Sequence, residues 1–159
     1  MTFGVGDRLL NFLRELQVAT TWTVVVTEEA EGGSKWRLAG STWEATVVVE
    51  PRSWLGLTFE ARDPLAGRSA TYDIDTDLYD ISLDDQRKFA EEIECDIIEF
   101  LANLRAKAVL RGNDGSKFVL VFPSNGSCVR VVQGRFLASV STCADLAAAR
   151  TGGDYVPVE

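Results

Sequence analysis

The first hydrophobic pattern in the chain has the spacing of an amphipathic helix. Asp7 stands before this pattern, where its carboxylate can accept hydrogen bonds from the free amide groups of a first helical turn. The apolar side chains then recur every three or four residues and share one face of a helix. We predict a helix from Asp7 to about Val18, with an apolar stripe formed by Leu9, Leu10, Phe12, Leu13 and Leu16.

Between residues 22 and 75 the pattern changes to an alternation of polar and apolar positions. β-Branched and aromatic residues occupy alternate positions, and short runs rich in glycine, serine, proline and aspartate separate the segments. This combination is typical of antiparallel strands joined by turns. We predict a continuous five-stranded antiparallel meander with strands at 22–28, 35–39, 43–50, 55–61 and 70–74.

A long amphipathic helix is predicted to follow, starting at Ser82 and ending near Lys107. The Ser82 hydroxyl can cap it, and Asp84 and Asp85 lie in the first turn, where the helix dipole favours negative charge. Apolar residues form one stripe and acidic residues occupy the remaining faces, which we expect to face solvent. The stripe consists of Phe89, Ile93, Ile97, Leu101 and Leu104, and the acidic residues are Glu91, Glu92, Glu94, Asp96 and Glu99.

The C-terminal third has turn residues at short intervals and predicts further antiparallel strands, at 108–111, 118–122, 128–132 and 136–141. Thr142 can cap a short C-terminal helix through Arg150, and the Gly152-Gly153 pair after it is expected to begin a flexible tail over 152–159. With 159 residues, 46% hydrophobic, and no repeat or linker, the chain is expected to form a single α+β domain over 1–159.

The absence of histidine narrows the chemistry more than any motif does. A count of zero excludes Ser-His-Asp and Cys-His hydrolases, histidine-ligated zinc and haem bound through a proximal histidine. Gly4-Val5-Gly6 does not follow a strand, so a dinucleotide fingerprint is not indicated. Acidic residues from Asp73 to Asp84 have the length of a calcium loop, but the sixth position is Leu78 where glycine is needed. We expect no cofactor and no metal site.

The three cysteines and the N-terminal sequence indicate the cellular compartment of the protein. An odd number of cysteines without a CxxC pair indicates neither a disulfide framework nor a thiolate zinc site, so we expect reduced thiols. Cys128 lacks a histidine base and is expected to be inert rather than nucleophilic. The N-terminus does not have the pattern of a signal peptide, and the longest apolar runs are too short for a bilayer. We expect a cytoplasmic protein, and the excess of arginine over lysine is typical of a GC-rich, bacterial genome.

Negative charge is concentrated in one segment of the chain. Residues 73–99 contain eleven acidic residues against Arg87 and Lys88, in a chain whose net charge is −8. Such a surface repels nucleic acids and favours fast association with basic proteins, although a solvated helix face has the same composition. The candidate partner-binding residues on this helix are Glu91, Glu94 and Asp96.

Aromatic and basic residues on the predicted strands provide two further candidates. Of four tryptophans, Trp54 has the opposite alternation to its apolar neighbours Leu55 and Leu57, so we expect it to be exposed and available to a partner. The other three, Trp22, Trp36 and Trp43, are expected mainly in the core. Arginines on the C-terminal strands are candidates for an anion site, with alternating exposed charges as the commoner explanation: Arg111, Arg130 and Arg135.

Three functions remain open at this point. The leading hypothesis is a non-enzymatic acidic protein-binding module, either a chaperone-like adaptor or an immunity-type inhibitor that covers a basic surface. The order of elements resembles that of small acidic bacterial secretion chaperones, which have no enzymatic activity and usually have a shorter first sheet. The alternatives are a small-molecule-binding domain with an apolar pocket and, less favoured, an enzyme acting through carboxylates. An unpaired strand edge would allow a homodimer.

Overall fold

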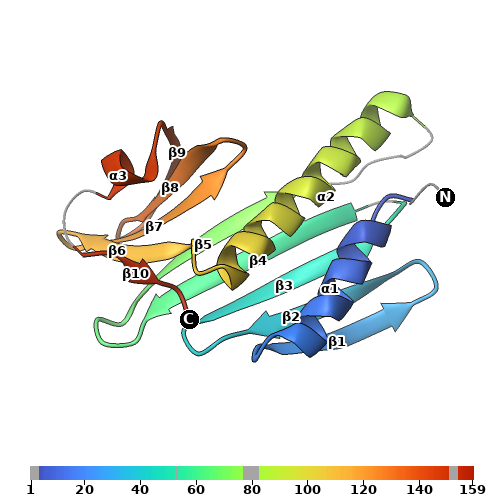
Figure 1. Cartoon of the computed structure of the whole chain (residues 1–159), viewed down its shortest axis with the longest axis horizontal. Coiled ribbons are helices and arrows are strands. Elements are labelled where there is room, and N and C mark those ends of the chain that lie inside the picture. The colour runs from blue at the N-terminus through green and yellow to red at the C-terminus, as the bar shows by residue number, and fades with distance from the viewer. Residues whose placement is uncertain (1–3, 53, 77–82, 151–153) are drawn as a thin grey trace. The chain divides into compact units, whose positions relative to one another are not determined.

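The computed structural model describes residues 4–52, 54–76, 83–150 and 154–159, and it is an α+β fold. Figure 1 shows the order of its elements, whose bounds are α1 (Asp7–Ala19), β1 (Thr23–Ala30), β2 (Gly33–Ala39), β3 (Trp43–Glu50), β4 (Trp54–Asp63), β5 (Arg68–Asp75), α2 (Asp84–Arg105), β6 (Leu110–Asp114), β7 (Lys117–Ser124), β8 (Ser127–Gln133), β9 (Ala138–Cys143), α3 (Leu146–Ala149) and β10 (Val156–Pro157).

The chain divides into two compact units. The first consists of Met1–Gly40, Glu44–Phe59 and Asp73–Ile98, and the second of Ser41–Trp43, Glu60–Tyr72 and Glu99–Glu159. Strands β4 and β5 and helix α2 each contribute to both units. That the whole chain is one domain stays a prediction.

The first sheet is the antiparallel meander that the alternation predicts, with the strand order β1-β2-β3-β4-β5. In the first unit, β2 pairs with β3 so that Trp36 lies opposite Val47 and Leu38 lies opposite Ala45. All four side chains are buried, because they share the face of the sheet that the helices cover. Strand β3 has the predicted ends, whereas the others differ from the prediction by a few residues; β2, for example, begins at Gly33 rather than Lys35.

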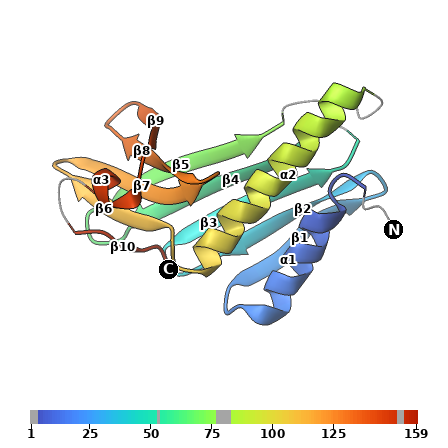
Figure 2. The ribbon, with the colours of Figure 1, turned by 45° about the horizontal axis from the view of Figure 1, so that its top comes forward.

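Helices α1 and α2 lie side by side on the same face of this sheet in the first unit (Figures 1 and 2). The predicted stripe of α1 is confirmed at Leu9, Leu13 and Leu16, all fully buried. The predicted cap is wrong, because Asp7 is already the first helical residue and Gly6 precedes it as the N-cap. Gly6 has a φ of 89° and no side chain to offer, while the Asp7 carboxylate accepts a hydrogen bond from the Gly4 amide at 2.8 Å.

Within α2, the buried line differs in part from the predicted stripe. Ile97, Leu101 and Leu104 are buried as expected, but Phe89 is 45% exposed, because Ala90 occupies the inward position in that turn. The predicted cap at Ser82 lies outside the described residues.

The second sheet belongs to the second unit and has the order β10-β6-β7-β8-β9, with every neighbouring pair antiparallel. On one face, the Phe122 ring packs against Tyr72 and Phe100 at centroid distances of 4.8 and 5.0 Å. The opposite face is partly covered by α3 (Figure 2), and Ala149 joins a small cluster with Val119, Val121 and Cys128.

The end of the chain differs from the prediction. The stretch expected to form a terminal helix from Thr142 to Arg150 has only the four helical residues of α3, and β9 extends through Cys143. Of the tail expected over 152–159, residues 154–159 are described, and they contain β10, which pairs with β6. Val158 is 3% exposed, and its amide donates to the Val109 carbonyl at 2.9 Å. This part of the chain is therefore a packed strand rather than a free tail.

The prediction of three reduced thiols is also wrong. Cys128 and Cys143 lie directly opposite each other on β8 and β9, and a disulfide joins them. Only Cys95 is free among the cysteines, and it is exposed on α2. The physical reason is the register of the β8–β9 hairpin, which brings the two Cα atoms within 5.0 Å, a distance that disulfides span.

Candidate functional site

The N-terminal turns of α2 expose apolar side chains among carboxylates. Leu83 lies just before the helix, on the same side as Ala90, Glu94 and Ile97. The successive intervals between these four residues are seven, four and three, and each such interval returns to about the same side of an α-helix. The last three side chains are buried, whereas Leu83 is 48% exposed and Phe89, in the next turn, 45% exposed. The buried side of the helix thus reaches solvent at Leu83, and Phe89 is exposed next to that side. Sequence reasoning assigned Phe89 to the core and did not single out Leu83.

Carboxylates surround these two apolar side chains on the helix surface. Asp84, Asp85, Glu91 and Glu92 are all exposed, and Asp85 and Glu92 stand four residues before and three residues after Phe89. Asp84 and Asp85 also occupy the first turn, where the free amide groups of the helix favour negative charge. We call this surface, consisting of Leu83, Asp84, Asp85, Phe89, Glu91 and Glu92, the acidic end of α2.

The three acidic residues predicted as partner-binding residues have different surroundings. Glu91 is exposed, as expected. Asp96 is half-buried. Glu94 is 1% exposed, so the expectation that it faces solvent is wrong.

Glu94 connects α2 to the start of α1. Its carboxylate accepts hydrogen bonds from the Arg8 guanidinium and from the Leu9 amide, both at 3.2 Å. Leu9 lies in the first turn of α1, whose N-cap Gly6 has no side chain to cap it. Burial lowers the pKa of Arg8, but the charges and hydrogen bonds of Cys95 and Glu94 outweigh burial and raise this pKa above its ordinary value. Glu94 is therefore a structural cap supplied by a different helix, and it does not belong to the acidic end of α2.

Trp54 is half-buried rather than fully exposed. Its indole Nε1 donates to a carboxylate oxygen of Asp75 at 2.7 Å, and the same atom lies 3.0 Å from the place that a Cβ on Gly56 would occupy. A Cβ at position 56 would therefore crowd the indole, and the glycine leaves the Trp54 ring room beside β4. Trp36 and Trp43 are buried, as expected, and Trp22 is half-buried.

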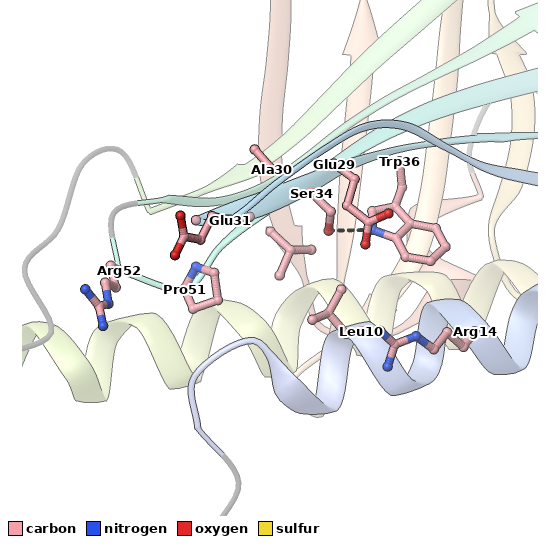
Figure 3. Close-up of a pocket in the computed structure, with 12 residues that line it drawn as sticks. Leu10, Arg14, Glu29, Ala30, Glu31, Ser34, Trp36, Pro51 and Arg52 are labelled. Atoms are coloured by element: carbon pink, nitrogen blue, oxygen red, sulfur yellow. Dashed lines mark hydrogen bonds between the residues drawn. The ribbon is translucent and has the colours of Figure 1, made fainter.

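A cavity of about 620 Å³ lies between α1 and the β1–β2 hairpin of the first unit (Figure 3). Buried Trp36 and Val49 line it, and the Trp36 indole donates to the Ser34 hydroxyl at 2.9 Å. Charged side chains of both signs stand around it: Arg14, Glu29, Glu31 and Arg52. A second cavity of about 400 Å³ borders the same hairpin and is lined in part by Trp54.

The arginines proposed for an anion site are not brought together as one site. Arg111 lies 3.9 Å from the Asp63 carboxylate on one face of the second sheet, and Arg130 pairs with Asp114 at 3.0 Å on the other face. Arg135 stacks over the Phe136 ring, 5.3 Å from its centroid, and lines a cavity of about 580 Å³ in the second unit. Since carboxylates pair with two of the three, this arrangement gives no common anion-binding centre.

Among the described residues, no group of three or more aspartate, glutamate or cysteine side chains is placed to hold a metal ion. Part of the acidic stretch from Asp73 to Asp84 lies outside the described residues. No helix in the described part of the chain is long and apolar enough to cross a membrane. Comparison of the chain with protein families, with curated proteins and with solved structures finds no match.

Proposed function

We propose that the protein is a non-enzymatic protein-binding module and that the acidic end of α2 is its main contact surface. The observation that carries the proposal is the exposure of two large apolar side chains at the start of α2: Leu83, on the side of the helix that is buried from Ala90 onward, and Phe89, beside that side. An exposed aromatic and an exposed leucine within a polar rim have the composition of an interface anchor.

The charges around these side chains define the chemistry of the partner. Four carboxylates attract a basic segment and increase its association rate, and the two apolar side chains bind its hydrophobic residues. The partner is thus an amphipathic segment of a protein, with lysine or arginine next to apolar residues. Such a surface would serve either a chaperone-like adaptor or an immunity-type inhibitor that covers a basic surface.

The test is affinity capture from a lysate of the native host with the tagged protein and two variants. Phe89→Ser combined with Glu91→Lys and Glu92→Lys changes the acidic end of α2. Glu28→Lys combined with Glu29→Lys makes the same charge change on exposed positions of β1 and serves as the matched control. A stoichiometric partner that the α2 variant loses, and the control retains, supports the proposal. Equal retention by both variants contradicts it.

A small-molecule-binding function is the second candidate, favoured by the cavity next to Trp36. Its apolar floor suits the body of a ligand, and the arginines and glutamates around it suit opposite ends of a zwitterion. An aromatic amino acid has this chemistry, so free phenylalanine is the probe. Phenylalanine would be titrated into the protein and followed by NMR. Chemical-shift changes of the protein that saturate in the wild type and are absent in Leu10→Trp, which fills the cavity, would favour this function. No change up to millimolar phenylalanine would dismiss it.

A further inference from the structure

The ends of the two sheets differ in how they are protected from pairing with another chain. The ends of the first sheet are β1 and β5, and those of the second are β10 and β9. Exposed strand edges are usually protected by charge, by proline, by short length or by a covering segment. The four strands differ on these criteria.

Three of the four strands have such protection. Strand β1 carries Glu28 and Glu29, and the Gln17 side chain donates to its Val24 carbonyl at 3.0 Å. Strand β5 carries charged residues along its length, including Asp73 and Asp75. Strand β10 has two residues, of which one is Pro157.

In the described part of the chain, strand β9 has none of these features. Its sequence is Ala-Ser-Val-Ser-Thr-Cys, without charge or proline, and its first five residues are exposed. Val140 is 58% exposed, and Phe136 and Leu137, just before the strand, are 84% and 81% exposed. Val140 and Thr142 favour an extended strand, so β9 presents a neutral, pairing-competent edge in a chain of net charge −8.

The turns on both sides of β8 show which backbone groups of β9 point outward. Asn125 and Gly126 have φ values of 49° and 79°, which makes a two-residue hairpin loop closed by a hydrogen-bonded pair, Ser124 and Ser127. Backbone groups alternate sides along a strand, so those of Ser127 point to β7 and those of Cys128 point to β9.

The loop after β8 gives the same alternation independently. The Gly134 amide donates to the Leu137 carbonyl at 2.8 Å, so the backbone groups of residue 137, and of every second residue after it, point to β8. Those of the intervening residues point away from the sheet. The outward-pointing residues of β9 are Ala138, Val140 and Thr142.

We propose that two copies of the protein associate by antiparallel pairing of β9 with β9 of the second copy, with the two-fold axis at Val140. In this register Val140 faces Val140 of the second copy, and Ala138 faces Thr142 of the second copy. Each facing pair exchanges both backbone hydrogen bonds, because all three residues point outward. A two-fold axis through one residue gives an identical surface on both partners, as homodimers require. The neutral strand allows two acidic molecules to approach without like charges facing each other.

Analytical ultracentrifugation with a proline variant tests the pairing. Val140→Pro removes an outward N–H and leaves the β8–β9 hydrogen bonds intact, and Val140→Lys keeps the N–H while adding like charge at the axis. We expect the wild type to shift with concentration from 17.4 kDa towards twice that mass. Both variants should raise the dimer dissociation constant at least about tenfold, with unchanged circular dichroism. A wild type that stays monomeric into the millimolar range overturns the proposal, as does a variant that dimerises as well as the wild type.

Cross-linking tests the register. In a Cys95→Ser background, Val140→Cys places two thiols opposite each other, and a short bismaleimide should join them. Ala138→Cys is the register control, because its two copies would lie roughly 14 Å apart along the strands. Val25→Cys on β1, where the valine is 42% exposed, is the control for random collision. Higher yield at 138 or at 25 than at 140 contradicts the proposed register.

Discussion

At the scale of single residues, the same residue type has opposite roles depending on the side of the helix. Glu91 and Glu94 are both glutamates on α2, three residues apart, yet Glu91 is exposed and Glu94 is 1% exposed. A buried carboxylate is stable only when its hydrogen bonds are made, and Arg8 and the Leu9 amide make them here. Sequence periodicity alone assigns both glutamates to solvent. It cannot show that Glu94 caps α1, because that contact depends on the tertiary packing of the two helices.

Glu94→Ala should lower the free energy of unfolding by about 2–4 kcal/mol, since it leaves a buried amide and a guanidinium without their acceptor. Glu94→Gln keeps an acceptor oxygen and should cost less. Glu91→Ala, on the exposed side, should change stability by no more than about 0.5 kcal/mol. Urea denaturation at pH 7 measures all three. Equal losses for Glu94→Ala and Glu91→Ala would show that Glu94 is no cap.

Asp63 makes the stability of the second unit depend on pH in the acidic range. Burial raises its pKa, but hydrogen bonds from the Ala66 and Leu65 amides, a hydrogen bond from Asn113 and the Arg111 charge together lower the pKa below its ordinary value of 3.8. The ionised form is therefore favoured by folding. Its stabilising contribution is complete above the ordinary pKa and is lost as pH falls through the lowered one.

Asp63→Asn should therefore destabilise the protein at pH 7 and have a smaller effect near pH 3. The measurement is the free energy of unfolding of both proteins between pH 3 and 7. A difference between them that does not shrink on acidification would rule out this role for the Asp63 charge.

At the scale of elements, the sequence predicts those parts of the fold that depend on neighbours in the chain. Alternation at Trp43–Glu50 gives β3 with the predicted ends, and helical spacing at Leu9, Leu13 and Leu16 gives α1. Prediction from the sequence fails where an element distant in the chain decides whether a residue is buried or paired. Phe89 has the spacing of a core residue but stays exposed, and the Cys128–Cys143 pair depends on the register of a hairpin.

The disulfide should stabilise the β8–β9 hairpin measurably. It closes a loop with a sequence separation of 15, for which chain entropy predicts about 3 kcal/mol. Replacing both Cys128 and Cys143 by serine should lower the free energy of unfolding by about 2–3 kcal/mol. Dithiothreitol should destabilise the wild type by a similar amount and leave the double variant unchanged. If the reductant leaves the wild type unaffected, the bond contributes no stability.

At the scale of the whole molecule, charge and exposed apolar groups are unevenly distributed along the chain. Residues 73–99 account for a net charge of −9, more than the −8 of the complete chain. The acidic end of α2 lies in this segment, whereas β9 is neutral. The two proposed associations therefore use different surfaces, one charged and directed at a basic partner, one neutral and directed at a second copy.

Of the proposed contact surface, the sequence indicates the acidic helix and the exposed position of Glu91, but not the exposure of Leu83 and Phe89. Composition reveals a concentration of charge directly, because counting needs no structure. The exposure of Leu83 and Phe89 depends on where the packing that buries the later turns of α2 ends. Hydrophobic periodicity carries no information about that point.

The most direct test of the proposed function is the salt dependence of binding between the protein and the partner that it captures. Titration calorimetry at ionic strengths from about 0.05 to 0.5 M would show it, because added salt shortens the range of interaction between exposed charges. We predict that affinity falls at least about tenfold over this range for the wild type, and that Glu91→Lys with Glu92→Lys removes most of this dependence. An affinity that is unchanged by salt, or by the two substitutions, would contradict the assignment of the acidic end of α2 as the binding surface.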